Sequence, residues 1–301
     1  MKVLLTGKSG QVGYELERSL QGLGEIIALD RIQMDLTNLD QVRAVIRAVQ
    51  PSLIINPAAY TNVDQAESEP DLAMRINGEA PAVMAEEAKK LGAAMIHYST
   101  DYVFDGSKTA PYTEDDATCP INVYGRTKLA GEQAIQAADI PHLILRTSWV
   151  YGMRRKNFLL TVLRLAQERD ELRIVSDQRG APTWCRTIAD TTAHIVAQLQ
   201  PFPAERRTGD RRASIMHDLW QNRSGLYHLT AQGQTTWYGF TKAILEHPSV
   251  VKKPIVTPIT TQDYPMPAKR PGNSVLSCER LTSMFCGLTA WESALRLCQE
   301  N

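Results

Sequence analysis

The sequence predicts an α/β fold with a doubly wound parallel sheet that is covered by helices on both faces. Three observations support this. Short apolar runs alternate with longer stretches of helical periodicity through the first half of the chain. A glycine-rich segment follows the first apolar run directly, and polar residues stand where later runs end. Unbroken apolar strands separated by helices are typical of a parallel sheet that is buried on both faces.

The expected elements follow one another in a regular order. We expect strands over residues 2–6, 25–29, 53–56, 94–99 and 142–146. We expect helices over residues 11–20, 39–49 and 71–91, and a further helix that carries Tyr124. Later in the chain, residues 158–169 and 291–297 have the periodicity of amphipathic helices. Because ligands bind at the carboxyl ends of the strands in such folds, the residues that follow each strand are the candidates for a site.

Composition limits the class of protein. A length of 301 residues suits one large domain or two closely joined ones, and 33 Lys and Arg balance 33 Asp and Glu. We therefore expect neither nucleic acid nor an anionic membrane as a partner. The N-terminus lacks the pattern of a signal peptide, and no apolar run reaches the length of about 18 residues that suggests a membrane span. The five cysteines have no metal-binding or CxxC spacing, so we expect reduced thiols in a cytoplasmic protein.

A glycine-rich segment joins the first predicted strand to the first predicted helix. Glycines at this place allow a tight turn, let the backbone approach a pyrophosphate and let helix and strand pack closely. The free N–H groups of the helix N-terminus then face the phosphates. The spacing is Gly-x-x-Gly-x-x-Gly rather than the usual Gly-x-Gly-x-x-Gly, so its position carries the prediction, and an ordinary turn is the alternative. The expected contacts of a dinucleotide here are Gly7, Gly10, Gln11, Val12 and Gly13.

The end of the second predicted strand bears on the choice of cofactor. Asp30 lies about 20 residues beyond the glycine segment, where a carboxylate would accept hydrogen bonds from the adenosine ribose. Arg31 follows directly and could instead face a 2′-phosphate. An acid beside a base leaves the choice between NADH and NADPH open.

Two further strand ends carry candidate site residues. After the third strand come Ala58 and Ala59, whose small side chains would let a flat ring or a ribose lie close to the backbone, although a tight loop explains them equally well. At the end of the fourth strand, the Thr100 hydroxyl could share a substrate carbonyl oxygen with Tyr124. Its alternative role is to cap backbone groups, as most threonines at such places do.

Tyr124 and Lys128 are four residues apart, so on a helix they lie on one face. A nearby ammonium favours the phenolate, and we therefore expect Lys128 to lower the pKa of Tyr124. Such a phenol can give a proton to a carbonyl oxygen near neutral pH. The spacing alone is a weak signal, because an amphipathic helix with a solvated lysine produces it by chance. Three other predicted strand ends also carry candidate site residues, and together with them the Tyr124–Lys128 pair is a strong signal of an active site.

Taken together, these residues resemble the extended short-chain dehydrogenase/reductase family, and within it the dTDP-4-dehydrorhamnose reductases. The likeness covers nearly the whole chain, from residue 7 to residue 274. Besides the glycine segment, it rests on Ala66-Glu67-Ser68-Glu69-Pro70, Ser99-Thr100-Asp101-Tyr102-Val103-Phe104-Asp105-Gly106, Asn122-Val123-Tyr124-Gly125-Arg126-Thr127-Lys128-Leu129-Ala130-Gly131-Glu132, Arg146-Thr147-Ser148-Trp149-Val150-Tyr151-Gly152 and Arg270-Pro271-Gly272-Asn273-Ser274.

The resemblance implies a Rossmann-type doubly wound sheet, completed by a smaller, discontinuous C-terminal substrate-binding lobe. We expect the dinucleotide-binding domain over residues 1–150, completed by parts of 180–240. We expect the smaller lobe over residues 151–180 and 241–301.

The reaction that the resemblance implies is the reduction of the C4 ketone of dTDP-4-dehydro-L-rhamnose by NADPH or NADH. Tyr124 would then protonate the developing alkoxide, Lys128 would hold the nicotinamide ribose, and Thr100 would hydrogen-bond the reacting oxygen. Further implied cofactor contacts are Asp35, Leu36 and Tyr60. Implied contacts of the sugar nucleotide are Asp101, Val63, Trp149 against the deoxysugar, and Arg270 at the diphosphate.

Two alternatives stay open. A chain with this fold can serve as a non-catalytic, NAD(P)-binding regulatory subunit, but the retained Thr100, Tyr124 and Lys128 argue for an enzyme. Another sugar-nucleotide reductase or an epimerase is the nearer rival. A dehydratase of this group normally has Thr-Asp-Glu after the fourth strand, whereas this chain has Thr-Asp-Tyr, ending at Tyr102.

Two departures from the family are visible. Residues 201–223 form a polar, arginine-rich stretch that is longer than the usual connection and that we expect to be a solvated loop. Some relatives are associated with Mg²⁺ at a dimer contact. Glu15 and Glu292 match two of the acidic positions, but Arg186 stands at the third, and an arginine cannot bind Mg²⁺. We therefore expect no metal site, with an Arg186–glutamate contact in its place, and we leave open whether the chain forms a homodimer.

Overall fold

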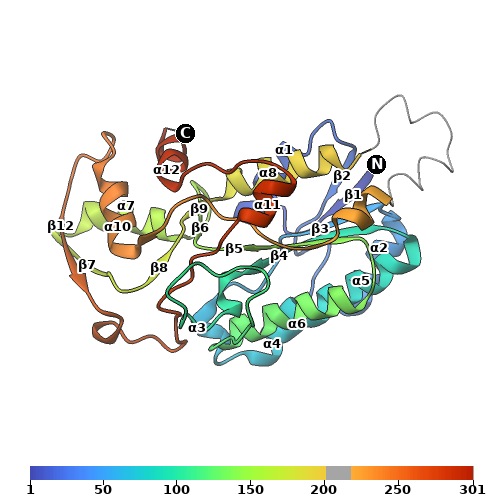
Figure 1. The fold of residues 1–301 in the computed structure, drawn as a ribbon, viewed down its shortest axis with the longest axis horizontal. Coiled ribbons are helices and arrows are strands. Elements are labelled where there is room, and N and C mark those ends of the chain that lie inside the picture. The colour runs from blue at the N-terminus through green and yellow to red at the C-terminus, as the bar shows by residue number, and fades with distance from the viewer. Residues whose placement is uncertain (201–217, 301) are drawn as a thin grey trace.

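The computed structural model describes residues 1–200 and 218–300 and has a six-stranded parallel sheet at its centre (Figure 1). The strand order is β10-β5-β4-β3-β1-β2. The bounds are Lys2–Leu5 for β1, Glu25–Ala28 for β2, Leu53–Asn56 for β3, Ala94–Thr100 for β4, His142–Thr147 for β5 and Gly225–His228 for β10. Every neighbouring pair is parallel. The predicted α/β, Rossmann-type fold is therefore confirmed, and β10 is a strand that the sequence analysis missed.

Helices cover both faces of this sheet. One face carries α1 (Gln11–Ser19) and α8 (Cys185–Gln198), and the other carries α2 (Leu39–Val49), α5 (Ala80–Leu91) and α6 (Val123–Ala137). Figure 1 shows α1 and α8 above the strands, and α5 and α6 below them. Because α8 packs against α1 and β10 pairs with β5, segments from the second half of the chain complete the sheet begun by the first half.

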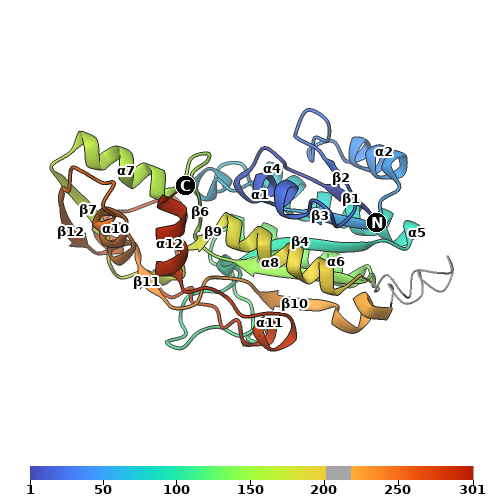
Figure 2. The same cartoon turned by 90° about the horizontal axis from the view of Figure 1, so that it is seen from above.

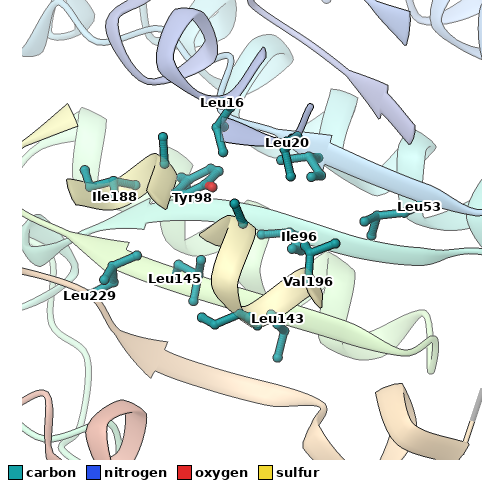
Figure 3. Packing of buried hydrophobic residues seen from close by; sticks show 14 of the residues in the cluster. Leu16, Leu20, Leu53, Ile96, Tyr98, Leu143, Leu145, Ile188, Val196 and Leu229 are labelled. Atoms are coloured by element: carbon teal, nitrogen blue, oxygen red, sulfur yellow. The ribbon is translucent and has the colours of Figure 1, made fainter. Parts of the chain in front are cut away.

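The alternation of side chains along each strand explains why the strands read as unbroken apolar runs. In β5, Leu143 and Leu145 join the core under α1 and α8, whereas Ile144 joins the core on the opposite face. Figure 3 shows Leu143 and Leu145 with Leu16 of α1 and Ile188 of α8 in the first of these cores. Since successive residues point to opposite faces and both faces are covered by helices, apolar residues are favoured at consecutive positions.

The single helix expected over residues 71–91 is interrupted. It consists of α4 (Pro70–Met74), the π-helical turn η1 (Arg75–Glu79) and α5. Pro81 lacks an N–H and cannot continue the ordinary hydrogen-bond pattern with Asn77, four residues before it, and a π-turn absorbs this mismatch. The Asn77 carbonyl oxygen lies against Gly131 of α6, where a Cβ atom would be only 2.3 Å away. The irregular turn is therefore packed closely against the helix that carries Tyr124.

A further hydrophobic core, called the second core below, lies beside the two that cover the sheet. Figures 1 and 2 show the elements that form it at the left. Residues Tyr151, Leu159, Phe240 and Trp291 are among its buried members. The predicted amphipathic helices are present there, as α7 (Phe158–Glu168) and α12 (Trp291–Gln299). The division of the chain into the domain ranges given above stays a prediction.

The other elements of this region are short. They are β6 (Val150–Tyr151), β7 (Glu171–Val175), β8 (Arg179–Gly180), β9 (Thr183–Trp184), β11 (Thr235–Thr236), α10 (Trp237–Glu246) and β12 (Ile255–Ile259). Their strands pair as β6 with β9, β7 with β12, and β8 with β11. Elsewhere lie α3 (Val63–Ala66), η2 (Asp101–Val103), η4 (Thr261–Asp263) and α11 (Glu279–Met284).

The described residues bear on two further expectations from the sequence, the loop at residues 201–223 and the absence of a membrane span. Most of the arginine-rich stretch, residues 201–217, lies outside the described residues, so its expected loop structure is untested. Within residues 1–200 and 218–300, no helix is both long enough and apolar enough to cross a bilayer.

Candidate active site

A cleft of about 1020 Å³ lies at the carboxyl ends of the central strands and extends toward the second core. Its lining brings together almost all of the predicted site residues from six separate segments of the chain. These are Gly7, Gly10, Gln11, Val12, Gly13, Arg31, Asp35, Leu36, Ala58, Ala59, Tyr60, Val63, Thr100, Asp101, Tyr124, Lys128 and Trp149. Two predicted residues, Asp30 and Arg270, are not part of this lining.

The glycine segment has the geometry of a phosphate cradle. Gly7 has φ +60°, and a Cβ atom there would lie 2.9 Å from the Ala58 Cβ. A Cβ at Gly13 would lie 2.2 Å from the Gly7 carbonyl oxygen, so only glycine allows α1 to start this close to β1. Gly10 caps α1 without a side-chain hydrogen bond, which leaves the first N–H groups of the helix to a ligand. These features fit the pyrophosphate of a dinucleotide.

The far end of the cleft has both an acid and a base. The Asp30 carboxylate accepts hydrogen bonds from the backbone N–H groups of Ile32 and Gln33, at 3.0 and 3.2 Å, and so orders its own loop. Arg31 is largely exposed, with its Nε 3.7 Å from Asp35 Oδ1. A backbone hydrogen bond from Thr37 lowers the pKa of Asp35. This end can therefore meet either a ribose hydroxyl or a 2′-phosphate.

Tyr124 stands in the first turn of α6, which is fixed by close packing. The Asn122 side chain caps the helix by accepting from the Gly125 N–H at 2.7 Å. A Cβ at Gly125 would lie 2.1 Å from the Tyr102 carbonyl oxygen, so the helix start is pressed against η2. The rings of Tyr102 and Tyr124 meet edge to face at 6.0 Å. The position of the phenol is thus set by the end of β4.

The expectation that Lys128 lowers the pKa of Tyr124 is wrong. Burial, together with the smaller effect of the Asp101 charge, raises the pKa of Tyr124 to about 12, and a hydrogen bond with Thr100 acts in the opposite direction. The Lys128 ammonium is directed elsewhere, since Nζ donates to the Tyr98 carbonyl oxygen at 2.5 Å and lies 3.1 Å from His97 Nε2. Burial lowers the pKa of Lys128 itself to about 8.

Asp101 is a buried carboxyl group at the centre of the site. It is 2% exposed, and its Oδ1 accepts from the Thr100 hydroxyl at 3.0 Å. Its Oδ2 is buried and has no hydrogen-bond partner in the described part of the chain. Burial raises the pKa of Asp101 to about 7, against the effect of hydrogen bonds from Ser274 and Thr100. This oxygen therefore lacks a partner within the described residues, although Asp101 lines the cleft.

An aromatic pair closes the cleft on the side of the second core. Trp149 adopts φ +47° and stacks on Trp237, with ring centroids 3.5 Å apart and planes 7° from parallel. A Cβ at Gly180 would lie 2.4 Å from the Trp149 indole, so glycine leaves room for this ring. Trp237 also lines the cleft and donates from Nε1 to Gln178 at 3.1 Å. Sequence reasoning missed Trp237, because nothing in the sequence pairs it with Trp149.

Arg270 is engaged by a carboxylate rather than directed into the cleft. Its two guanidinium nitrogens contact the two Asp64 oxygens at 2.5 and 2.7 Å, and the first also donates to the Ala268 carbonyl. Asp64 follows Val63, so this bidentate ion pair joins the 268–270 loop to α3. The predicted contact of Arg270 with a diphosphate stays a prediction.

A basic loop that was not predicted crosses from the second core to the glycine segment. Arg155 donates from Nε to the Ser9 carbonyl oxygen at 2.8 Å, and Asn157 donates to the Gln11 side chain at 3.0 Å. Arg155, Lys156 and Asn157 all line the cleft. The loop places two cations beside the candidate phosphate cradle.

Arg186 is paired with Glu15, with Nε 3.0 Å from Oε2. Glu292 lies in the first turn of a different helix, α12, and is exposed. Within residues 1–200 and 218–300, no group of three or more His, Cys, Asp or Glu side chains could hold a metal ion. The expected Arg186–glutamate contact is therefore present, whereas the expectation that no Mg²⁺ binds at this position stays a prediction.

Comparison with known proteins gives one consistent result. The family model described as RmlD substrate binding domain matches residues 1–301. A dTDP-4-dehydrorhamnose reductase of Burkholderia thailandensis is 46% identical, over 99% of this chain and 98% of its own. One of Escherichia coli K12 is 44% identical, over 95% of this chain and 92% of its own.

Solved structures agree with the sequence comparisons. A dTDP-4-dehydrorhamnose reductase of Bacillus anthracis in complex with NADP has a TM-score of 0.87 and 32% identity, with 99% of this chain and 98% of that chain covered. A UDP-glucose 4-epimerase of Thermus thermophilus in complex with NAD has a TM-score of 0.77 at 18% identity, over 100% of this chain and 98% of its own, which indicates a shared fold alone.

Proposed function

The chain belongs to the RmlD substrate binding domain family, and from this membership we infer the reaction that it catalyses. It reduces the C4 ketone of dTDP-4-dehydro-L-rhamnose with NADPH or NADH, which is the last step of dTDP-L-rhamnose synthesis. The observation that carries this is the 46% identity to a reductase of that name over nearly the whole chain. The cleft supports it, because Thr100, Tyr124 and Lys128 line it together with the glycine segment.

The cofactor would be held by residues from three strand ends and from the loop that contains Arg155 and Lys156. The N–H groups at the start of α1 would bind its pyrophosphate, with Arg155 and Lys156 close by. Asp30 and Arg31 would face the adenosine ribose, and Ala58 would leave space for the flat part of the molecule. When bound, the reduced nicotinamide supplies the hydride.

Three side chains of the chain itself would act on the reacting carbonyl. Tyr124 would donate the proton that the C4 oxygen gains, and Thr100 would donate a hydrogen bond to the same oxygen. Negative charge grows on this oxygen during reduction, so donors already aimed at it stabilise the transition state more than the ground state. Lys128 would hold the nicotinamide ribose and supply positive charge on the cleft side.

The sugar nucleotide would occupy the part of the cleft between Asp101 and the Trp149–Trp237 pair. Asp101 Oδ2 would accept from a sugar hydroxyl, and the Trp149 ring would pack on the apolar face of the deoxysugar. Val63 would line the same region, and Arg270 would lie at the diphosphate. We further propose a cytoplasmic location, because the substrate and cofactor are those of a biosynthetic reductase.

We propose that the Arg186–Glu15 ion pair takes the place of a metal ion, and that any homodimer forms without Mg²⁺ at this position. Elemental analysis of the purified protein tests this directly. Stoichiometric Mg²⁺ that survives gel filtration in metal-free buffer would contradict it.

One experiment tests the proposed reaction. Purified protein is mixed with dTDP-4-dehydrorhamnose and either NADPH or NADH, and the absorbance of the reduced nicotinamide is followed with time. We expect substrate-dependent decay, with the sugar product identified by mass spectrometry. If neither cofactor is consumed while both still bind, the chain is a non-catalytic, nucleotide-binding protein.

A further inference from the structure

The loop from Gly152 to Asn157 follows β6 and leads into α7. Its shape is set by the Asn157 side chain, whose Nδ2 lies 2.8 to 3.3 Å from three carbonyl oxygens of the loop itself. Oδ1 of the same side chain accepts from the Leu160 N–H at 3.1 Å and so caps α7. This 152–157 loop is therefore a turn wrapped around one amide group, which fixes where its side chains begin.

Two guanidinium groups join the 152–157 loop to the N-terminal segment of the chain. Arg155 donates from Nε to the Ser9 carbonyl oxygen at 2.8 Å. The Arg154 guanidinium lies over the Tyr14 ring, 3.6 Å from its centroid. Ser9 belongs to the glycine segment and Tyr14 follows it directly, so the loop reaches from the second core to the candidate phosphate cradle.

The backbone of Arg155 is in the left-handed region, with φ +61°. In the described part of the chain, the other residues besides glycine with a positive φ are Gln50, Asp139 and Trp149. Gln50 caps α2 and Asp139 follows the cap of α6, and left-handed residues are common at the ends of helices. Trp149 and Arg155 are at no helix end, and both line the cleft. A large left-handed residue costs free energy, and such residues concentrate at functional sites.

The cations of the loop are available to a ligand. The terminal guanidinium nitrogens of Arg155 and the Lys156 ammonium line the cleft without a hydrogen-bond or ion-pair partner among residues 1–200 and 218–300. The glycine segment has no acidic residue, and its own basic residue, Lys8, does not line the cleft. Glu15, the next acid along α1, is paired with Arg186. An anion in the cradle would therefore meet two positive charges.

The acidic side chains that line the cleft stand on other segments. They are Asp35, Glu69 and Asp101, and each already accepts a hydrogen bond from another group of the protein. The glycine segment offers a phosphate only neutral N–H groups and the partial charge of a helix end. A guanidinium adds a full charge and several donors in a plane that matches phosphate oxygens.

We propose that Arg155, assisted by Lys156, binds the pyrophosphate of the nicotinamide cofactor from the wall of the cleft that the second core forms. Nε stays on the Ser9 carbonyl oxygen, and the terminal nitrogens donate to the phosphate oxygens. The left-handed backbone at Arg155 is retained because this side chain is needed in the cleft. The inference rests on the proposed function for the identity of the cofactor.

The test measures the dissociation constants of NADPH and of NADH from nicotinamide fluorescence, in two variants of one residue. Arg155→Gly removes the side chain and suits the left-handed backbone, whereas Arg155→Gln keeps the backbone demand and removes only the charge. Both variants should weaken both cofactors by roughly tenfold, the lower end of the effect of a hydrogen bond to a charged group. Lys156→Gln should weaken them by roughly 2–5-fold, because no contact fixes its side chain.

Two variants serve as matched controls. Arg154→Gln removes the same charge from the same loop, but Arg154 packs on Tyr14 and does not line the cleft, so both dissociation constants should stay unchanged. Gln50→Gly relieves a left-handed residue outside the cleft and should also leave cofactor binding unchanged. Thermal unfolding without cofactor checks that every variant is folded.

Three results would overturn the proposal. Unchanged binding of both cofactors in both Arg155 variants would show that the side chain only joins the loop to the glycine segment, and an equal loss in Arg154→Gln would show a general effect of charge. Weaker binding of NADPH alone would place Arg155 at the 2′-phosphate. Weaker binding of dTDP in a calorimetric titration, with both cofactors unaffected, would place it at the diphosphate of the sugar nucleotide.

The failure of the proposed function looks different, because these titrations need no turnover. A protein that binds both cofactors but does not reduce the sugar nucleotide would remove the reductase function and leave the role of Arg155 intact. An unmodified protein that binds neither NADPH nor NADH would overturn both.

Discussion

The replacement Asp101→Asn should increase stability more at pH 8 than at pH 5. The carboxyl group is 2% exposed, and burial raises its pKa from the ordinary 3.8 to about 7. Between these two values the folded protein keeps the proton while the unfolded chain releases it. The free energy of unfolding therefore falls as the pH rises through this window, and the loss is complete above pH 7. At about 1.36 kcal/mol per pKa unit, the full effect is roughly 4 kcal/mol.

An asparagine at this position keeps the acceptor for Thr100 but cannot ionise. Its NH₂ group takes the place of the Oδ2 that lacks a partner, and the cost of burying that donor is the same at every pH. The quantity to measure is thus the stability difference between variant and unmodified protein, from urea unfolding at each pH. We expect this difference to be roughly 2.5 kcal/mol more favourable to the variant at pH 8 than at pH 5.

Asp105→Asn provides a matched control. Hydrogen bonds from Ser107 lower the pKa of Asp105 below 3.8, so this carboxylate is ionised in both states at pH 5 and above. Its variant should differ from the unmodified protein by the same amount at both pH values. If Asp101→Asn also gives a difference that does not change with pH, then Asp101 is ionised in the folded protein and the account of its burial fails.

Three further predictions concern the reaction. Tyr124→Phe should lower kcat by roughly 10²–10³-fold, the effect typical of losing one donor to a developing oxyanion, with an unchanged NADPH dissociation constant in a fluorescence titration. Full turnover in this variant would remove the proton-donor role. Trp237→Ala should raise KM for the sugar nucleotide by roughly 2–10-fold, since a stacked aromatic pair contributes about 0.5–1.5 kcal/mol, and should leave NADPH binding intact. Arg270→Ala and Asp64→Asn should raise the same KM equally if the ion pair only holds the loop, as initial rates over a substrate series would show. A larger effect of Arg270→Ala would identify direct contact with the diphosphate.

The central sheet could be predicted because its determinants are local. Each strand of the first half is a short apolar run bounded by polar residues, and both faces of the sheet demand this pattern. The short strands of the second core could not be predicted in the same way. Thr183–Trp184 and Arg179–Gly180 are each held by a partner far away in sequence, so their conformation depends on tertiary pairing. A strand of two residues is too short to show the alternation of apolar and polar residues that predicts a strand.

The part of the site that lies at the strand ends could be predicted from the topology of the sheet. Parallel strands end at one edge of the sheet, so Gly7, Ala58 and Thr100 had to meet there. The contacts that define the substrate end come from side chains that only the folded chain brings together. Arg270 meets Asp64 across 206 positions, and Trp149 meets Trp237 across 88 positions. Neither pair has a sequence spacing or a motif from which its contact could be predicted.

Tyr124 and Lys128 both line the cleft as predicted, but the predicted lowering of the pKa of Tyr124 was wrong in sign. Burial explains the difference. The spacing argument treated the two groups as if only their mutual attraction mattered. In the folded protein Lys128 is buried and Tyr124 is partly buried, and this loss of contact with water disfavours the charged form of each, so it raises the pKa of the phenol and lowers that of the ammonium. Tyr124 then keeps its proton at every pH near neutrality, as a proton donor must before it reacts. A loss of reductase activity above about pH 8 would therefore report the lost charge of Lys128 rather than ionisation of Tyr124. Since the ammonium is directed at Tyr98 and His97, its influence on the phenol must come from charge in the cleft rather than from a direct contact.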